Sequence, residues 1–352
     1  FFGAGISMAD GAPSQAQILS RMYQQNNQSE SYKNHLGEIM AFLKKAFDYD
    51  QESTSTPSLE YIFGFIDFFL TLNQSYTKYY TTNKLIEIRE NLIRFINHFI
   101  HEKINPESGD MSELISRIKD INTNVSVITL NYDTLFEDSF SKYIVDNLYI
   151  SFCYDLVNYR YQYLSPDSWL INPDEAMLLP EKSEPKTIKF LKLHGSLNWF
   201  YCNVCNSLMI KPRYHKRVTS LNTDCAEMDK DTTKLLCPQD GSRMLSLTTP
   251  PAYKKDLTHP VISNLLIEAS NEISAAKKIV FIGYSMPEAD VHIKAILSRA
   301  GTHDKKLIVI NPFMDDDTKH RYQQLNNDVE FIEKTFTDVL NDGDMDMILK
   351  RD

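Results

Sequence analysis

The stretch Lys278-Ile-Val-Phe-Ile282 decides the fold, and it ends at the turn-forming residues Gly283-Tyr-Ser285. A short apolar run of β-branched and aromatic residues, closed by a turn, is typical of a strand. A helical pattern over Glu288–Ala300 follows, and then a second run of the same kind, Lys306–Ile310. Strands that alternate with helices indicate a parallel sheet with helices on its faces.

The same alternation extends outward from this stretch. It predicts strands at Val125–Leu130, Thr187–Leu193 and Val329–Ile332, and helices at Thr134–Tyr143, Val261–Ala276 and Asp315–Gln324. Phe1-Phe2 is expected to be the end of a further strand whose start precedes this numbering. The fold class is therefore α/β, a Rossmann-like doubly wound parallel sheet, with a helical insertion and a small cysteine-bearing module.

The region 15–118 has a helical pattern. Apolar residues recur three and four positions apart, in Ile39, Phe42, Leu43 and Phe47 and again in Leu85, Ile88, Leu92, Phe95, Ile96 and Phe99. This spacing predicts amphipathic helices. The polar segment Asp48–Ser58 is expected to be a loop in which Ser58 caps a helix that starts near Leu59.

The helical insertion also carries many aromatic side chains. Five of them follow one another closely: Tyr61, Phe63, Phe65, Phe68 and Phe69. Core packing accounts for most of these, while an oligomer contact or a lid is the alternative for apolar faces that are left over.

The domain organisation follows from these patterns. Segments 1–14, 119–197 and 246–352 are expected to form the Rossmann-like domain, interrupted by the helical insertion 15–118 and by a small module, 198–245. The small module lacks periodicity and holds four of the five cysteines of the chain, between Cys202 and Cys237.

Composition excludes two classes of protein. The formal charge of the 352 residues is −10, from 47 acidic and 37 basic side chains, and no Lys/Arg block forms a stripe for binding a phosphate backbone, so a direct nucleic-acid substrate is not expected. No apolar run reaches the roughly 20 residues that span a bilayer, and we expect a cytoplasmic protein. The acidic tail Asp342–Asp352 is expected to be a solvated end or the start of a linker.

Two motifs lie where the first predicted strands end. In Gly3-Ala4-Gly5-Ile6-Ser7 the glycines let the backbone approach a pyrophosphate, although a tight turn alone explains such a motif equally well. Asn131 can position a ribose hydroxyl or a water, and Asp133 can accept hydrogen bonds from ribose or nicotinamide. The alternative is that Asn131 and Asp133 only cap the next helix.

Further polar residues follow the later strands. His194 can take a proton near neutral pH from a ribose hydroxyl or a water, although a lone histidine is more often structural. The turn Gly283-Tyr284-Ser285 suits phosphate or ribose contact, and Asn311 suits the adenosine ribose. A turn or cap role remains open for each residue of this turn and for Asn311.

The cysteines form an incomplete metal-binding pattern. Cys202-X-X-Cys205 is a good half-site, but the second half is Cys237-Pro-Gln-Asp240. A closed structural zinc site needs four ligands. Either Cys225 or Asp240 can supply the fourth, or the module folds without zinc.

In this order, the motifs resemble those of the sirtuin family. The resemblance covers Phe1–Ser14 and Val125–Ile332. The family's protein deacylases have a Phe-Arg pair after the first loop, where this chain has Ser14-Gln-Ala, and here Leu130 and Tyr284 replace the family's Gln and Thr. With these departures the chain looks like the sirtuin-like effectors of bacterial anti-phage systems, which hydrolyse NAD⁺.

This resemblance implies roles for individual residues. Asn131 and His194 would be catalytic, and NAD⁺, as substrate, would contact Gly3, Ala4, Gly5, Ile6, Ser7, Ser14, Asn131, Asp133, Gly283, Tyr284, Ser285 and Asn311. It also implies a homo-oligomer and a partner protein that gates activity, such as a HerA-type ATPase or a short Argonaute.

Three functions remain open at this point. The first is an NAD⁺ glycohydrolase that depletes NAD⁺ in anti-phage defence and releases nicotinamide and ADP-ribose. The second is an NAD-dependent protein deacylase or ADP-ribosyltransferase, which the missing Phe-Arg pair opposes. The third is a non-catalytic sensor of NAD or ADP-ribose, which the presence of Asn131 and His194 opposes.

Overall fold

The structure is a computed structural model. It describes residues 1–13, 15–24, 30–50, 53, 56–101, 109–140, 148–154, 186–210, 236–237, 239–242, 244–248, 257 and 259–350.

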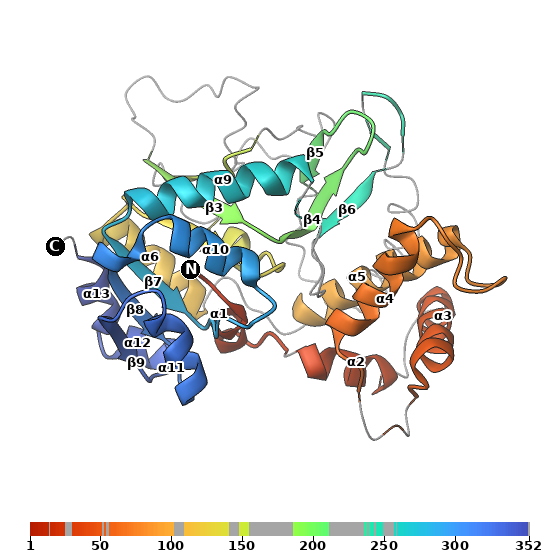
Figure 1. The fold of residues 1–352 in the computed structure, drawn as a ribbon, viewed down its shortest axis with the longest axis horizontal. Coiled ribbons are helices and arrows are strands. Elements are labelled where there is room, and N and C mark those ends of the chain that lie inside the picture. Colours follow the sequence, from red (N-terminus) through yellow and green to blue (C-terminus); the bar gives the residue numbers. More distant parts are fainter. Residues whose placement is uncertain are drawn as a thin grey trace.

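A parallel sheet lies among the helices on the left of the molecule in Figure 1. Its strands are β1 (Ser126–Thr129), β2 (Leu148–Ser151), β3 (Lys186–Lys192), β7 (Lys278–Ile282), β8 (Lys306–Ile310) and β9 (Val329–Ile332). Strand β3 pairs with β1 and β2, and β8 pairs with β7 and β9, all in parallel. Phe2 bridges Thr129 and Ile282 in parallel and so joins the two halves. The resulting order, β2-β3-β1-Phe2-β7-β8-β9, confirms the doubly wound sheet and the strand end expected at Phe1-Phe2.

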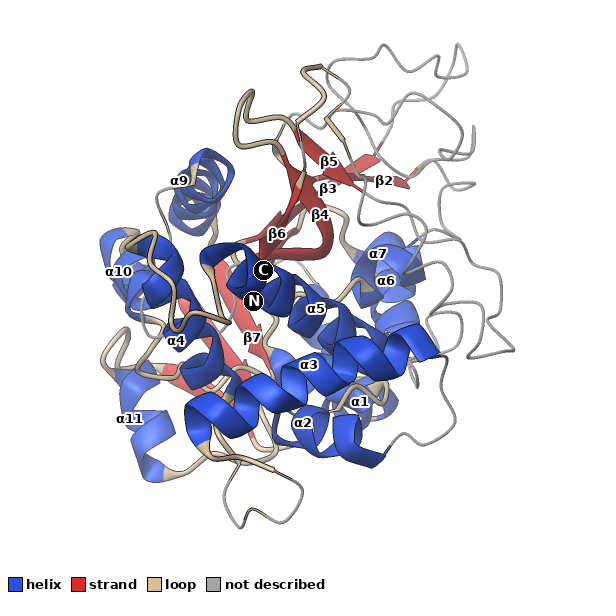
Figure 2. Ribbon diagram, turned by 90° about the vertical axis from the view of Figure 1, so that its right-hand side faces the viewer, coloured by secondary structure: helices blue, strands red, loops and turns tan. Residues whose placement is uncertain are grey.

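Helices cover both faces of this sheet. They are α1 (Ala4–Ala9), α6 (Asp110–Ile121), α7 (Leu135–Phe140), α9 (Pro260–Ala275), α10 (Val291–Arg299), α11 (Asp316–Gln323), α12 (Phe336–Asn341) and α13 (Asp344–Leu349). Helix α6 packs with α1, α7, α12 and α13, while α9 packs with α10 and β3. Figure 2 shows β7 between α9 and α10 on one side and α1, α6 and α7 on the other. Buried apolar side chains such as Phe281 and Val309 fill the space between the layers.

The remaining N-terminal helices form a second apolar core. They are α2 (Gln15–Gln24), α3 (Glu30–Phe47), α4 (Leu59–Thr71) and α5 (Thr82–His101). In Figure 1 they lie on the opposite side of the molecule from β8 and β9. The predicted apolar positions of α3 and α5 are buried apart from Phe47, which is half-buried. Ser58 accepts a hydrogen bond from the Tyr61 amide at 3.2 Å, which confirms the predicted cap.

Helix α6 differs from its helical neighbours in the chain. Its buried side chains Met111, Leu114, Ile115 and Ile118 join the core of the sheet and not that of α2–α5. The packing therefore groups α6 with the Rossmann-like layers, although residues 110–118 fall within the expected insertion.

A small antiparallel sheet stands beside the parallel one. Its strands are β4 (Gly195–Tyr201), β5 (Leu208–Ile210) and β6 (Leu245–Thr248), in the order β5-β4-β6. Strand β4 starts immediately after His194, earlier than the irregular segment that was expected from residue 198. Trp199 on β4 is fully buried in the core of the main sheet, which fixes the small sheet to it.

The acidic tail is not a solvated end over the part that the structure describes. Residues 344–349 form α13, and Met345 and Ile348 are buried in the core. These two apolar side chains lie three positions apart, on one face of the helix, while the acidic residues Asp344 and Asp346 are half-buried. Among the described residues, no helix is both long and apolar enough to cross a membrane.

Candidate active site

A cavity of about 340 Å³ opens where several parallel strands end. Gly3 follows the N-terminal segment, Asn131 follows β1, His194 follows β3 and Gly283 follows β7, and all four residues line this cavity. In open α/β sheets the carboxyl ends of the strands are the usual place for a ligand. The sheet thus brings together motifs that are up to 280 positions apart in the chain.

Three glycines allow the loops at this edge to pack against each other. A Cβ atom on Gly3 would stand 2.5 Å from the Gly283 carbonyl oxygen, and one on Gly5 would stand 2.7 Å from the Gly283 Cα atom. Gly283 has a φ of +61°, a conformation that favours glycine. A Cβ atom on Gly283 would also lie too close to the first loop, 2.5 Å from the Ile6 nitrogen. The Gly5 amide donates to the Gly283 carbonyl at 3.0 Å. The glycines therefore allow the two loops to pack closely, and the approach of Gly3 and Gly283 to a pyrophosphate stays a prediction.

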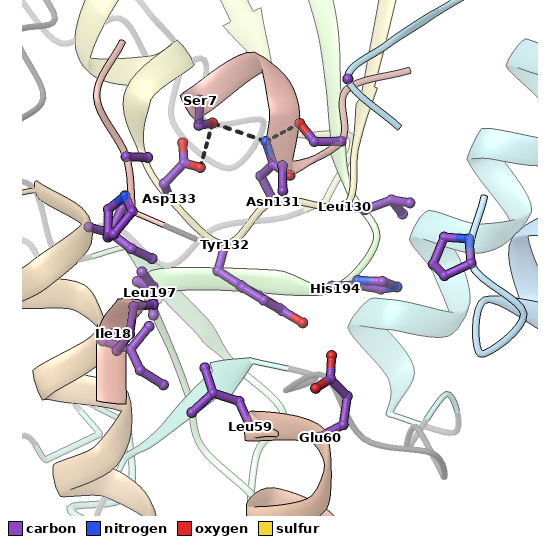
Figure 3. A pocket seen from close by; sticks show the side chains of 18 of the residues that line it. Ser7, Ile18, Leu59, Glu60, Leu130, Asn131, Tyr132, Asp133, His194 and Leu197 are labelled. Carbon is purple, nitrogen blue, oxygen red and sulfur yellow. Dashed lines mark hydrogen bonds between the residues drawn. The ribbon is translucent and has the colours of Figure 1, made fainter. Parts of the chain in front are cut away.

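Asn131, Ser7 and Asp133 form a hydrogen-bonded chain across the cavity wall (Figure 3). Asn131 Nδ2 donates to the Gly3 carbonyl at 2.9 Å and to Ser7 Oγ at 3.0 Å. Ser7 Oγ donates in turn to Asp133 Oδ2 at 2.8 Å. Both Nδ2 hydrogens are thus committed, so Asn131 Oδ1 is the atom that can accept from a ligand or a water.

Asp133 also has the capping role that was considered for it. Its Oδ1 accepts from the Leu135 amide at 3.0 Å, at the start of α7. Asn131 does not cap that helix, because its side chain reaches to the first loop instead. The cap and the link to Ser7 together fix the Asp133 carboxylate.

A buried ion pair supports the loop from below. Lys192 Nζ donates to the Asp133 carbonyl at 2.5 Å and to Glu137 Oε1 at 2.7 Å. The side chains of Lys192 and Glu137 are 0% and 1% exposed. Desolvation raises the pKa of Glu137 to about 7, although the positive charge of Lys192 acts in the opposite direction and lowers it. One cation thus ties β3 to both the loop and α7.

His194 belongs to a second polar cluster, on the α10 side of the cavity. Its Nε2 lies 3.0 Å from Nε2 of His292, and the rings of His194 and Tyr132 stack with centroids 6.1 Å apart. The Tyr284 hydroxyl donates to Asp290 Oδ2 at 3.0 Å. Burial, followed by the charge of Asp290, raises the pKa of Tyr284 well above its usual value, so this phenol stays protonated.

The helices α2, α4 and α5 provide the facing wall of the cavity. Six of its side chains there are apolar: Ile18, Leu59, Phe63, Ile93, Ile96 and Ile100. Glu60, in the first turn of α4, is the charged exception, and in Figure 3 its carboxylate lies near the end of the Tyr132 ring. Desolvation, with smaller contributions from Asp290 and Glu60, raises the pKa of Tyr132 well above its usual value.

Most of the predicted site residues line the cavity. Those that do are Gly3, Ala4, Ser7, Asn131, Asp133, His194, Gly283, Tyr284 and Ser285. Gly5, Ile6 and Asn311 are not among the lining residues: Ile6 is fully buried in the core, and Asn311 Oδ1 accepts from the Phe313 amide. Ser14 lies outside the described residues.

Four polar residues that line the cavity or lie next to it were not predicted as site residues: Glu60, Tyr132, Asp290 and His292. Glu60 lies on α4, and no local sequence pattern shows that this helix packs beside the sheet. His292 follows Asp290 by two positions in the segment after Gly283-Tyr-Ser285, and this spacing of a carboxylate and an imidazole near a strand end was the available signal.

The cysteine module contains two turns of the same form. The Cys202 amide donates to the Ser207 carbonyl and the Asn206 amide to the Cys202 carbonyl, at 3.0 and 2.9 Å. In the second turn, the equivalent bonds from Cys237 and Gly241 are 2.8 and 2.9 Å long, to the carbonyls of Ser242 and Cys237. Asn206 and Gly241 both have positive φ, 59° and 72°.

This correspondence places Asp240 where the first turn has Cys205. One donor atom each from Cys202, Cys205, Cys237 and Asp240 lies within 4.8 Å of the others. Three thiols and one carboxylate are a donor set that suits tetrahedral zinc. Cys225, the other candidate for the fourth ligand, lies outside the described residues.

Comparison with known proteins places these features in context. A family profile described as a SIR2-like domain matches residues 125–332. Similar solved structures include Sir2Tm bound to a propionylated peptide, with 15% identity, a TM-score of 0.43 and coverage of 98% of this chain and 92% of that chain. A Sir2 complex with a p53 peptide and NAD⁺ has 14% identity, a TM-score of 0.41 and coverage of 87% and 90%. No curated protein matches the chain.

Proposed function

Because the chain belongs to the SIR2-like domain family, we propose that it binds NAD⁺ in the cavity at Gly3, Asn131 and His194 and hydrolyses the nicotinamide–ribose bond. The observation that carries the proposal is the convergence of Asn131, Asp133 and His194 on one cavity from two different strands. A cavity of about 340 Å³ is within the size range of small-molecule sites. The products are nicotinamide and ADP-ribose.

Cleavage of the nicotinamide–ribose bond does not require a strong general acid in this site. The nicotinamide leaving group starts as a cation and departs neutral, while positive charge develops on the ribose. Asp133 places a fixed negative charge near that ribose, and Asn131 Oδ1 orients the attacking water. His194 then accepts the proton that the water releases.

Two features support water as the acceptor in preference to an acylated peptide. The chain has Ser14-Gln-Ala in place of the Phe-Arg pair of the deacylases. In addition, apolar side chains of α2, α4 and α5 cover the side of the cavity that faces the parallel sheet. A protein deacylase or ADP-ribosyltransferase remains the alternative that the assay below separates.

The test is to incubate the protein with NAD⁺, with and without an acetylated peptide, and to follow nicotinamide, ADP-ribose and peptide mass. We expect nicotinamide release without peptide, and at least about a 100-fold loss of it in Asn131→Ala and His194→Ala. His320→Ala, an exposed histidine on α11, is the matched control and should retain full turnover. Peptide-dependent consumption of NAD⁺ would identify a deacylase, and undiminished turnover in either site variant would refute the assignment.

We further propose that the enzyme depletes NAD⁺ during bacterial anti-phage defence. An NADase that is active at all times would harm its own cell, so the proposal includes assembly with itself and with a sensing partner, such as a HerA-type ATPase or a short Argonaute. The NAD⁺ assay is therefore also run on the protein co-expressed with the proteins encoded beside it. Failure to consume NAD⁺ in both forms would favour a non-catalytic sensor.

A structural zinc ion completes the proposal. Cys202, Cys205, Cys237 and Asp240 would hold it between the two turns of the cysteine module. Bound there, zinc would cross-link the two turns, which also contact each other through Cys202 Sγ and Asp240 Oδ2 at 3.2 Å.

A further inference from the structure

We propose that His194 and His292 share one proton, and that a proton taken up at His194 leaves the buried site through His292, whose positive charge Asp290 stabilises. The proposal rests on the role of His194 in NAD⁺ hydrolysis. His292 is a positioning residue in this scheme, because it acts through His194.

The contact between the two rings limits their protonation states. Their Nε2 atoms are 3.0 Å apart, which is hydrogen-bonding distance. Such a bond has one donor and one acceptor, so only one of the two Nε2 atoms can carry a hydrogen. The pair is therefore either neutral or carries a single positive charge.

A balanced transfer follows from this arrangement. In the neutral pair, His194 holds its hydrogen on Nε2 and offers the lone pair of Nδ1 to the attacking water. When Nδ1 takes the proton released by that water, the hydrogen on Nε2 passes to Nε2 of His292. His194 is then neutral again and His292 carries the positive charge.

Burial gives the transfer a direction. His194 is only 3% exposed, whereas His292 is half-buried on the first turn of α10. A cation costs less free energy near water than in the buried site. The proton therefore moves outward, from a closed position to one from which solvent can accept it.

Asp290 is held where it favours this cation. It occupies the N-cap position of α10, where an aspartate commonly accepts a hydrogen bond from the helix, yet its side chain makes no such bond. Instead its Oδ2 accepts from the Tyr284 hydroxyl at 3.0 Å, and one carboxylate oxygen lies within 4.8 Å of a nitrogen of each imidazole. A carboxylate at that distance stabilises a positive charge on the pair.

The other titratable groups that face His194 and His292 do not take over the stabilising role of Asp290. Tyr132, stacked on His194, is buried and remains an uncharged phenol near neutral pH. Glu60 lines the same cavity from α4 and adds negative charge from the opposite wall. Asp133, on the loop after β1, has both oxygens engaged by Ser7 and Leu135.

The main test compares His292→Gln with wild type. The Oε1 atom of glutamine can still accept the hydrogen bond that His194 Nε2 donates, but glutamine cannot take up a proton. We expect kcat for nicotinamide release to fall by at least about tenfold, with KM changed less than about twofold. A proton shared by two imidazoles binds more tightly than a proton on one, so the pKa of the pair is higher than that of His194 alone. The acid limb of the plot of kcat against pH should therefore move to lower pH in the variant. His320→Gln is the matched control and should change neither quantity.

A second measurement does not depend on activity. Nitrogen-15 NMR of the imidazoles should show one hydrogen-bonded Nε2 proton coupling His194 and His292 in the wild type, and its loss in both His292→Gln and His194→Gln. If this signal is present but NAD⁺ is not consumed, the proposed function fails while the shared proton stands. Independent titration of the two rings, or an unchanged kcat in His292→Gln, would overturn the proposal. So would a bound metal ion whose retention depends on His292, because the two rings would then be ligands.

Discussion

Among the described residues, Lys192 is the one buried cation that contacts the Asn131–Asp133 loop. Its removal should lower the free energy of unfolding. Lys192→Met takes away the partner of Glu137 and the donor to the Asp133 carbonyl. Because breaking a buried pair leaves one charge uncompensated, we expect a loss of about 3–5 kcal/mol in the free energy of unfolding, measured with urea. The cavity loop should also loosen, which lowers NAD⁺ turnover.

Lys189 on the same strand is the matched control. Its side chain is 41% exposed and pairs with Glu268 and Glu272. Exposed pairs contribute little, so Lys189→Met should cost only about 0–1 kcal/mol. Equal losses in the two variants would contradict the role given to the buried pair.

The pKa of Glu137 gives the same prediction a pH dependence. Burial raises this pKa from 4.5 to about 7, so between these values the folded protein binds a proton that the unfolded chain does not. Stability from this group is thus fully present below pH 4.5 and is lost as the pH rises through about 7. Glu137→Gln should flatten the unfolding free energy over that interval. The loss in Lys192→Met should likewise shrink at low pH, where Glu137 is neutral.

At the scale of elements, the two turns of the cysteine module are equivalent in their backbone and differ in one ligand. If they hold zinc through Asp240, purified protein should contain about one zinc per chain by metal analysis. Asp240→Ala should reduce this content, and Asp240→Cys should restore or increase it, because a second thiolate then completes the second turn. Full zinc content in Asp240→Ala would move the fourth ligand elsewhere, with Cys225→Ala as the variant that decides it.

Strands were predictable where a local pattern was enough. The ends of β7, β8 and β9 agree with the sequence prediction to the residue, since each strand is rich in β-branched and aromatic residues and lies between turns. Strand β4 was missed because Gly195-Ser-Leu-Asn-Trp contains polar residues, which are buried here by contacts with other segments, as with Ser196 Oγ and the Tyr132 carbonyl. Helix α13 was not predicted because the acidic residues around it dominate the local composition, although Met345 and Ile348 are buried.

At the scale of the whole molecule, the candidate site was predictable only in part. Asn131 and His194 are visible in the sequence because strand ends in parallel sheets converge. The wall formed by α2, α4 and α5 was not predictable, because it depends on how one helical unit packs against Leu197 and Tyr132. The same holds for the pairing of His194 with His292, residues that are 98 positions apart.

The contact between Gly3 and Gly283 ties the start of the chain to a loop near its other end, and it can be tested by adding one methyl group. In Gly3→Ala the new Cβ would meet the Gly283 backbone at 2.5 Å, so one loop must move. We expect a loss of about 1–3 kcal/mol in unfolding free energy and a lower affinity for NAD⁺.

Gly37→Ala is the matched control, since nothing lies within 4 Å of the added atom in the middle of α3. It should stabilise the protein by about 0.5–1 kcal/mol, because alanine favours helix more than glycine does. If Gly3→Ala were equally harmless, the close approach of the two loops would not be required.

The pairing of Phe2 with Ile282 has a consequence for biosynthesis. Ribosomes deliver the chain from its N-terminus, so Gly3 and Asn131 emerge long before the Gly283 loop that completes their cavity. A partly translated chain therefore has only one half of the central sheet and no finished pocket. If the protein is the NADase proposed above, this order of assembly keeps every unfinished copy inactive during synthesis.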